Sequence, residues 1–358
     1  MRKKLGLILG VVALAVSSVA CGLSHPTQDS LKPQGPYADK IYHLFVPVFW
    51  MGVVVFILVE GGILWFGIKY RHRPGRDRMP PQIHGNTRLE IGWTILPAVV
   101  LAVIAVPTVA TIWDLARKPP PNAINVTVTG QQWWWKFTYT DPDMKTADGS
   151  QLITADDLVI PTGRTVYLSV TSGFGNINDF EVIHSFWVPE LAGKQDAVPG
   201  RTNHILLQAD HPGTYLGQCA EFCGLSHANM RVHVIALSPT DYAAWVQNQL
   251  ADSVTPQSGS DAAAGMNLFM NPLPNGQGTC IACHAISGTS AAGIAGPNLT
   301  HFASRDCFAG CLFQNADPAQ IAAWLRNPPG VKPGSKMPNY HLTETEIQQL
   351  VAYLMSLK

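Results

Sequence analysis

Two long apolar runs dominate the first third of the chain. Residues 44–68 and residues 92–114 are each long enough to cross a bilayer as an α-helix, and tryptophan lies near an end of each run, where aromatic anchors are common. The loop between them, residues 69–91, is rich in lysine and arginine, which favours a cytoplasmic location. We therefore predict two transmembrane helices, with residues 21–43 as an external N-terminal segment and everything after the second helix also outside.

Residues 1–20 carry the pattern of an export signal peptide. A basic start is followed by a short apolar core, and small residues precede Cys21. Two outcomes stay open for the mature N-terminus, namely lipidation of Cys21 or plain cleavage after Ala20. Ser18 stands where lipoprotein signals usually carry leucine. Both outcomes agree with the orientation that the loop charges indicate.

Beyond the prolines at 119–121, the pattern changes to the alternation of half-buried strands. Apolar and polar residues alternate with period two at 125–129, 165–170 and 231–235, and glycine and proline turns separate these segments. We predict an all-β sandwich or barrel over residues 122–250.

The last part of the chain has a helical pattern. Residues 251–264 are rich in Ser, Gly, Ala, Asp and Gln without an apolar period, which predicts a flexible linker. We expect an all-α domain over residues 265–358. Its last helix starts with a capping box, Thr343 and Glu346, and then places apolar residues on one face.

The composition agrees with this division into several units. A chain of 358 residues exceeds one typical domain, and a charged fraction of 13% beside a hydrophobic fraction of 47% suits membrane segments. Lys+Arg and Asp+Glu are both 24, so net charge indicates no nucleic-acid partner. Most of the seven cysteines fall in closely spaced pairs, which favours ligation and cofactor attachment over a disulfide framework.

The β domain holds a group of soft and borderline metal ligands. Cys219, Cys223, His227 and Met230 follow one another closely, and His184 comes from an earlier segment. Thiolate, imidazole and thioether together are the set that copper prefers, and a second cysteine allows two thiolates to bridge two metals. A disulfide between the two cysteines would leave the histidines and the methionine unexplained. Methionine is a poor zinc ligand, so zinc is the weaker alternative.

The α domain contains the attachment sequence of a c-type haem, Cys280-Ile-Ala-Cys283-His284. The two thiols are expected to form thioethers with the haem, and His284 to bind the iron. Met337, well downstream, is the expected second axial ligand. The alternative is a bare redox C-x-x-C followed by histidine.

Cys307 and Cys311 lie outside these motifs. In an oxidising compartment, a disulfide that closes the short loop between them is the plain prediction. A free thiol pair or a metal site is the alternative.

The copper motif resembles a known family. His184-Ser-Phe-Trp-Val-Pro189, Pro199-Gly-Arg201 and the Cys-x-Glu-x-Cys-x3-His-x2-Met sequence that starts at Cys219 are similar to the CuA domain of cytochrome c oxidase subunit II. The resemblance spans about residues 44–250 and implies a cupredoxin-like sandwich.

The resemblance also implies a ligand set for a dinuclear copper centre. Cys219 and Cys223 would bridge both coppers. His184 and Met230 would complete one of them, and the other would be completed by His227 and the Glu221 carbonyl. The Glu221 carboxylate would then face a magnesium ion shared with subunit I.

Two further matches carry implied roles. Glu90, in the segment that leads into the second apolar run, resembles a glutamate associated with proton uptake; simple solvation at a helix start is the alternative. Trp133, the first of three consecutive tryptophans, resembles the residue that accepts electrons from docked cytochrome c, and core packing is expected for Trp134 and Trp135.

In the α domain, a second resemblance is to small cytochromes c. Gly265 and Phe269 resemble packing positions of their first helix, and the Pro297 carbonyl resembles the group that orients the axial histidine.

These features together predict the electron-input subunit of a haem–copper terminal oxidase in a bacterial plasma membrane. The expected partners are subunit I, which holds the oxygen-reducing site and couples its reaction to proton translocation, and other oxidase subunits. Cytochrome c or a cytochrome c reductase complex is the expected donor. A haem–copper nitric oxide reductase with the same relay is the alternative, and a copper-handling protein without turnover is a weaker one.

Overall fold

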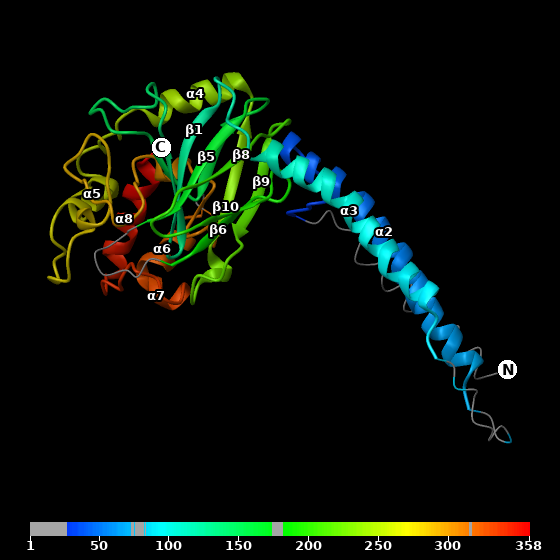
Figure 1. Ribbon diagram of the computed structural model, residues 1–358. Helices are drawn as coiled ribbons and strands as arrows, with labels where there is room; N and C mark the ends of the chain where they lie inside the picture. Colours follow the sequence, from blue (N-terminus) through cyan, green and yellow to red (C-terminus); the bar gives the residue numbers. More distant parts are fainter. Residues whose placement is uncertain (1–26, 73–74, 76–81, 83, 174–181, 315–316) are drawn as a thin grey trace, which may run out of the picture.

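The computed structural model describes residues 27–72, 75, 82, 84–173, 182–314 and 317–358 (Figure 1). The predicted signal peptide and Cys21 lie outside the described residues. The described chain forms a pair of long helices, a β-sandwich and a helical C-terminal domain, as the sequence predicted.

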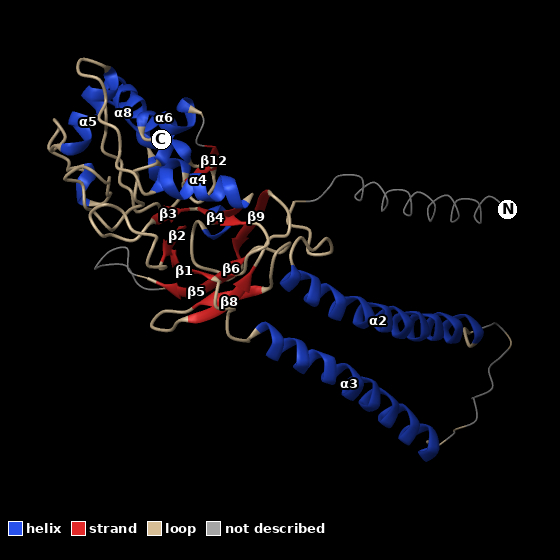
Figure 2. Ribbon diagram, turned by 90° about the horizontal axis from the view of Figure 1, so that it is seen from above, coloured by secondary structure: helices blue, strands red, loops and turns tan. Residues whose placement is uncertain are grey.

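The two long helices extend from one side of the sandwich (Figures 1 and 2). They are α2 (Pro36–Lys69) and α3 (Thr87–Leu115), and both are long and apolar enough to cross a membrane. Helix α2 begins eight residues before the predicted span at 44–68, because its first turn packs on the sandwich. There Tyr37 is 3% exposed, and its hydroxyl lies 3.1 Å from the Thr165 hydroxyl. An ion pair between Lys40 and Asp114 joins the two helices at the ends that lie next to the sandwich.

The sandwich consists of two five-stranded sheets whose inner faces form one apolar core. The period-two alternation of the sequence corresponds to strands with alternating burial. The first sheet has the order β3 (Ile153–Ala155), β2 (Trp134–Tyr139), β1 (Ile124–Gln131), β5 (Val166–Ser172) and β8 (Asn203–Leu207). The second has the order β4 (Asp157–Pro161), β10 (Arg231–Leu237), β9 (Gly213–Cys219), β6 (His184–Trp187) and β7 (Lys194–Ala197). Helix α4 (Pro239–Gln249) follows the last strand of the sandwich and contacts β4 and β10.

The C-terminal domain has a core of its own. Its helices are α5 (Asp261–Met270), α6 (Pro318–Arg326), α7 (Pro328–Val331) and α8 (Glu344–Ser356), with the short strands β11 (Cys307–Phe308) and β12 (Phe313–Gln314). Helix α5 packs on α8, and Gly265 permits this because a Cβ there would lie 2.9 Å from Cβ of Tyr353. The capping box of Thr343 and Glu346 begins α8, as predicted.

The segment after α4 differs from the flexible linker expected over 251–264. Helix α5 already begins at Asp261, because the Ser260 side chain caps it. The preceding residues lie along the C-terminal domain: the Ser253 amide donates to the Ser287 carbonyl at 3.2 Å, and the His301 ring lies 3.0 Å from the Ala251 carbonyl. Composition indicated a free tether, but local hydrogen bonds hold this segment.

Candidate copper centre and haem cavity

Five of the predicted copper ligands come together at one end of the sandwich. His184 begins β6, Cys219 ends β9, and the other three lie on the loop that leads to β10. The Sγ atoms of Cys219 and Cys223 are 3.8 Å apart. Nδ1 of His184 lies 3.8 Å from the first sulfur. Nδ1 of His227 and Sδ of Met230 lie 3.5 Å and 3.9 Å from the second.

Backbone contacts hold this ligand loop, residues 219–230, against the sandwich. The Cys219 amide donates to the Met230 carbonyl at 2.8 Å, so the two ends of the loop are tied together. The Glu221 carbonyl oxygen lies 3.2 Å from Sγ of Cys219, which brings the sixth predicted ligand atom to the cluster. Gly130 of β1 faces the His184 ring, and a Cβ at this position would lie 2.8 Å from that ring. The histidine can therefore occupy its place only beside a glycine.

The donor set fits copper. Two thiols, two imidazoles and a thioether surround one small volume, and both cysteines are free of a disulfide. The hydrogen bond between the two Sγ atoms lowers the pKa of the Cys219 thiol and, together with burial, raises the pKa of the Cys223 thiol. A metal ion bound by the two sulfurs would displace their protons, because the thiolate is the form of cysteine that binds metals.

Residues 132–135, which include the three consecutive tryptophans, contact the ligand loop from the side of β1 and β2. Nε2 of Gln132 and Nε1 of Trp133 both donate to the Cys223 carbonyl, at 2.7 Å and 3.0 Å. Trp135 is fully buried in the sandwich core, where its ring packs edge-on against His184, as predicted. Trp134 instead lines the cavity of the C-terminal domain, so it is only partly a core residue.

That cavity is the place where a haem would fit. Cys280, Cys283, His284 and Met337 all line it, so the structure brings the predicted attachment and axial residues together. Nδ1 of His284 lies 2.8 Å from the Pro297 carbonyl, which leaves Nε2 for the iron. Burial lowers the pKa of the His284 imidazole and so favours the neutral form that binds metals. Apolar side chains form most of the remaining wall, among them Phe269, Phe302, Leu325 and Leu350.

The haem cavity also reaches the sandwich. Gln132, Trp133, Trp134 and Asp156 contribute to its wall. Trp133 is 6% exposed, and Gly334, three residues before Met337, packs against its indole ring. One residue therefore contacts the copper loop on one side and the haem cavity on the other.

Polar contacts that the sequence did not indicate join the two domains. Nζ of Lys332 donates to the Trp133 carbonyl and the Ala309 carbonyl, both at 2.6 Å. Burial lowers the pKa of the Lys332 ammonium to about 8. The Ser226 hydroxyl, within the ligand loop, donates to the Pro333 carbonyl at 2.6 Å. Nothing in the sequence pattern distinguishes these residues from ordinary surface positions.

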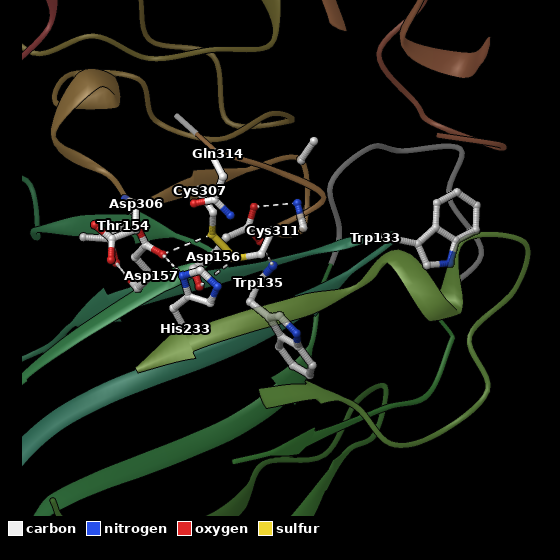
Figure 3. The surroundings of a disulfide bond; sticks show 12 residues. Trp133, Trp135, Thr154, Asp156, Asp157, His233, Asp306, Cys307, Cys311 and Gln314 are labelled. Atoms are coloured by element: carbon white, nitrogen blue, oxygen red, sulfur yellow. Dashed lines mark hydrogen bonds and ion pairs between the residues drawn. A yellow bond between two sulfur atoms is a disulfide. The ribbon is translucent and has the colours of Figure 1, made fainter. Parts of the chain in front are cut away.

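Cys307 and Cys311 form the predicted disulfide at the same interface (Figure 3). Asp157 and His233 of the sandwich lie close enough to complete a group of metal-capable side chains. Because the two sulfurs are bonded to each other, neither is a free thiolate, and the disulfide interpretation holds over the thiol pair or metal site.

Glu90 takes no part in either centre. It lies in the first turn of α3, at the end of the helix that is farther from the sandwich (Figure 2). Asn86 caps this turn by accepting from the amides of Arg88 and Leu89. A role of Glu90 in proton uptake therefore stays a prediction.

Three parts of the chain match known protein families. Residues 26–111 match the transmembrane domain of cytochrome c oxidase subunit II, residues 124–237 match its periplasmic domain, and residues 262–358 match cytochrome c. Cytochrome c oxidase subunit 2 of Alkalihalophilus pseudofirmus is 39% identical over 341 residues, which cover 92% of this chain and 90% of the relative. The chain belongs to the cytochrome c oxidase subunit II family.

Two other relatives match this chain over nearly their whole length. Cytochrome c oxidase subunit 2 of Bacillus sp. PS3 is 34% identical, covering 98% of this chain and 96% of the relative. The corresponding subunit of Bacillus subtilis is 31% identical, covering 99% and 98%. The protein is thus a subunit II of cytochrome c oxidase with a fused cytochrome c domain, and it supplies electrons to a haem–copper oxidase. It is a membrane protein with two transmembrane helices and periplasmic domains. The oxidase prediction holds over the nitric oxide reductase alternative.

Replacing one histidine at the copper cluster gives a sharp test of the ligand set. We expect His184→Ala in this subunit to weaken copper binding on the order of 10–100-fold or more, because a buried ligand is lost. Metal analysis after dialysis against a chelator measures the effect. His204→Ala is the matched control, since His204 is an exposed histidine of the same sandwich, and it should retain its copper. Equal copper content in both variants would contradict the assignment.

Proposed function

We propose that electrons enter this chain at a covalent c-type haem and leave it, toward subunit I, at a dinuclear copper centre. The haem would be held by Cys280, Cys283, His284 and Met337. The copper ligands would be His184, Cys219, the Glu221 carbonyl, Cys223, His227 and Met230. One observation supports electron transfer from haem to copper within the chain. The haem cavity reaches Trp133, and the indole of Trp133 donates to the carbonyl of Cys223.

The chain's own residues fix the haem side of this route. The Pro297 carbonyl holds the His284 ring in one tautomer and orientation. The apolar wall would exclude water from a bound haem, and ligation by Met337 together with His284 would favour reduced iron, which suits an electron carrier. When bound, the haem iron and the copper pair each accept and release single electrons.

The copper ligands are held rigidly by burial and by backbone hydrogen bonds. Four ligand side chains are nearly fully buried, and the ends of their loop are tied by the bond between the Cys219 amide and the Met230 carbonyl. A rigid site lowers the reorganisation that each electron transfer requires. Trp133 lies between this loop and the haem cavity, so we assign it to the route.

Several finer assignments belong to this proposal. The donor would be cytochrome c or a cytochrome c reductase complex, and oxygen would be reduced in subunit I. The Glu221 carboxylate would bind magnesium together with subunit I, Glu90 would serve proton uptake, and Cys21 would be lipidated in the bacterial plasma membrane. The half-buried position of Glu221 on the copper loop supports its place in this proposal.

Met337 is tested by a single substitution. We expect Met337→Ala to lower the haem midpoint potential and to remove the weak sulfur-to-iron charge-transfer band, because a soft neutral ligand is lost. Redox titration with optical detection measures both effects. Met266→Ala is the control, since Met266 packs on the core of the same domain. If the control loses the band and Met337→Ala keeps it, the assignment is wrong.

Removing the haem domain tests the order of transfer. The sandwich and the haem domain have separate apolar cores, so an oxidase whose subunit II ends at Leu250 should keep a folded sandwich. We expect oxygen uptake with the native donor to collapse, while the copper centre still accepts electrons from a small chemical reductant. Full turnover of the truncated oxidase with the native donor would contradict the proposed route.

A further inference from the structure

Two adjacent carboxylates of the sandwich face the haem domain. Asp156 precedes β4, Asp157 begins it, and each is only 2% exposed. Burial raises the pKa of both carboxyl groups, so their charged forms are costly unless hydrogen-bond donors surround them. Neither residue contributes a predicted ligand to the copper centre or the haem.

Each carboxylate accepts a hydrogen bond from a backbone amide of the haem domain. The Gly310 amide donates to Oδ2 of Asp156 at 2.7 Å, and the Asp306 amide donates to Oδ2 of Asp157 at 2.7 Å. Figure 3 shows Asp156, Asp157 and Asp306 beside the disulfide. Oδ1 of Asp156 accepts from the Trp135 amide at 3.0 Å, within the sandwich. The Asp156 carboxylate thus joins a strand beside the copper centre to a loop of the haem domain.

The disulfide closes this loop, residues 306–311. Ala309, Gly310 and Cys311 all have positive φ, of 57°, 73° and 52°, so the backbone makes a tight turn that ordinary residues disfavour. Gly310 also needs the space, because a Cβ there would lie 2.5 Å from Nζ of Lys332 and 2.7 Å from the Trp133 carbonyl. The bond between Cys307 and Cys311 restricts the loop to shapes of this kind.

Further contacts extend the same interface toward the two centres. The Arg231 amide, just after Met230, donates to the Gly310 carbonyl at 3.0 Å. Nζ of Lys332 holds the Trp133 and Ala309 carbonyls together. The positive charges of buried Lys332 and partly buried Arg305 act on Asp156, and that of Arg305 also acts on Asp157, so they offset part of the cost of burying the carboxylates.

We propose that Asp156, Asp157 and the disulfide-closed loop 306–311 form a docking latch that holds the haem domain with its cavity open toward Trp133. The latch keeps the two redox centres in one fixed arrangement, and the carboxylates are positioning residues for electron transfer within the chain. This inference rests on the proposed route from haem to copper.

The test uses the complete oxidase with the double substitution Asp156→Asn and Asp157→Asn in subunit II. Each amide keeps one acceptor oxygen, but at Asp156 the Trp135 amide needs that oxygen, so an NH2 group then faces the Gly310 amide. The loss of charged acceptors should raise hydrogen exchange at the Gly310 and Asp306 amides about tenfold or more. The rate of electron transfer from haem to copper should fall about tenfold or more and become dependent on viscosity.

Asp143→Asn is the control, because Asp143 is an exposed carboxylate of the same sandwich, and it should leave both measurements unchanged. Haem spectrum, haem potential and copper content should stay at their native values in every variant, which separates a loosened latch from a damaged centre. A second variant, Cys307→Ser with Cys311→Ser, opens the loop while both carboxylates of the sandwich are kept, and it should show the same changes.

Native exchange and a native transfer rate in the double Asp variant would overturn the latch. A native rate beside raised exchange would overturn its role in electron transfer. The proposed route is tested separately in the native oxidase, where the haem must be reduced before the copper centre; if copper is reduced first, the route fails whatever the variants show.

Discussion

The hydrogen bond from the Trp133 indole to the Cys223 carbonyl is the contact on which the arrangement of the two centres depends. It fixes the middle of the copper loop from outside the ligand set. The same tryptophan forms part of the haem cavity wall, and its own carbonyl is held by Lys332 of the haem domain. The position of the copper ligands and the position of the haem domain are therefore linked through one side chain and its backbone.

Many polar contacts join the two domains around Trp133. Each domain buries its large apolar side chains in its own core, and between them lie buried carboxylates, a buried lysine and backbone amides. Such groups are costly to bury unless their hydrogen bonds are complete, so they favour one relative position of the domains over many similar ones. This is how a polar interface can position two redox centres without a shared core.

The sequence predicted the features that local spacing encodes. The helix pair and the strands follow from length and period, and the haem attachment sequence and the cluster at Cys219 follow from short motifs. The complete copper ligand set, with the Glu221 carbonyl, is implied by the resemblance to cytochrome c oxidase subunit II. The docking of the domains could not be predicted, since Asp156 and Lys332 bind partners 154 and 199 positions away. Composition also misled for residues 251–264: a polar segment was expected to be free, but Ser260 caps α5 and the preceding carbonyls are bound.

In the docked arrangement, electrons pass from haem to copper without a diffusional encounter of the haem domain on a tether. Rapid photochemical reduction of the haem in the native oxidase, followed by optical detection at both centres, measures the rate of this transfer. We expect a single-exponential transfer whose rate does not change with solvent viscosity or ionic strength. A transfer rate that falls as viscosity rises would instead show that the haem domain must find its partner on a flexible linker.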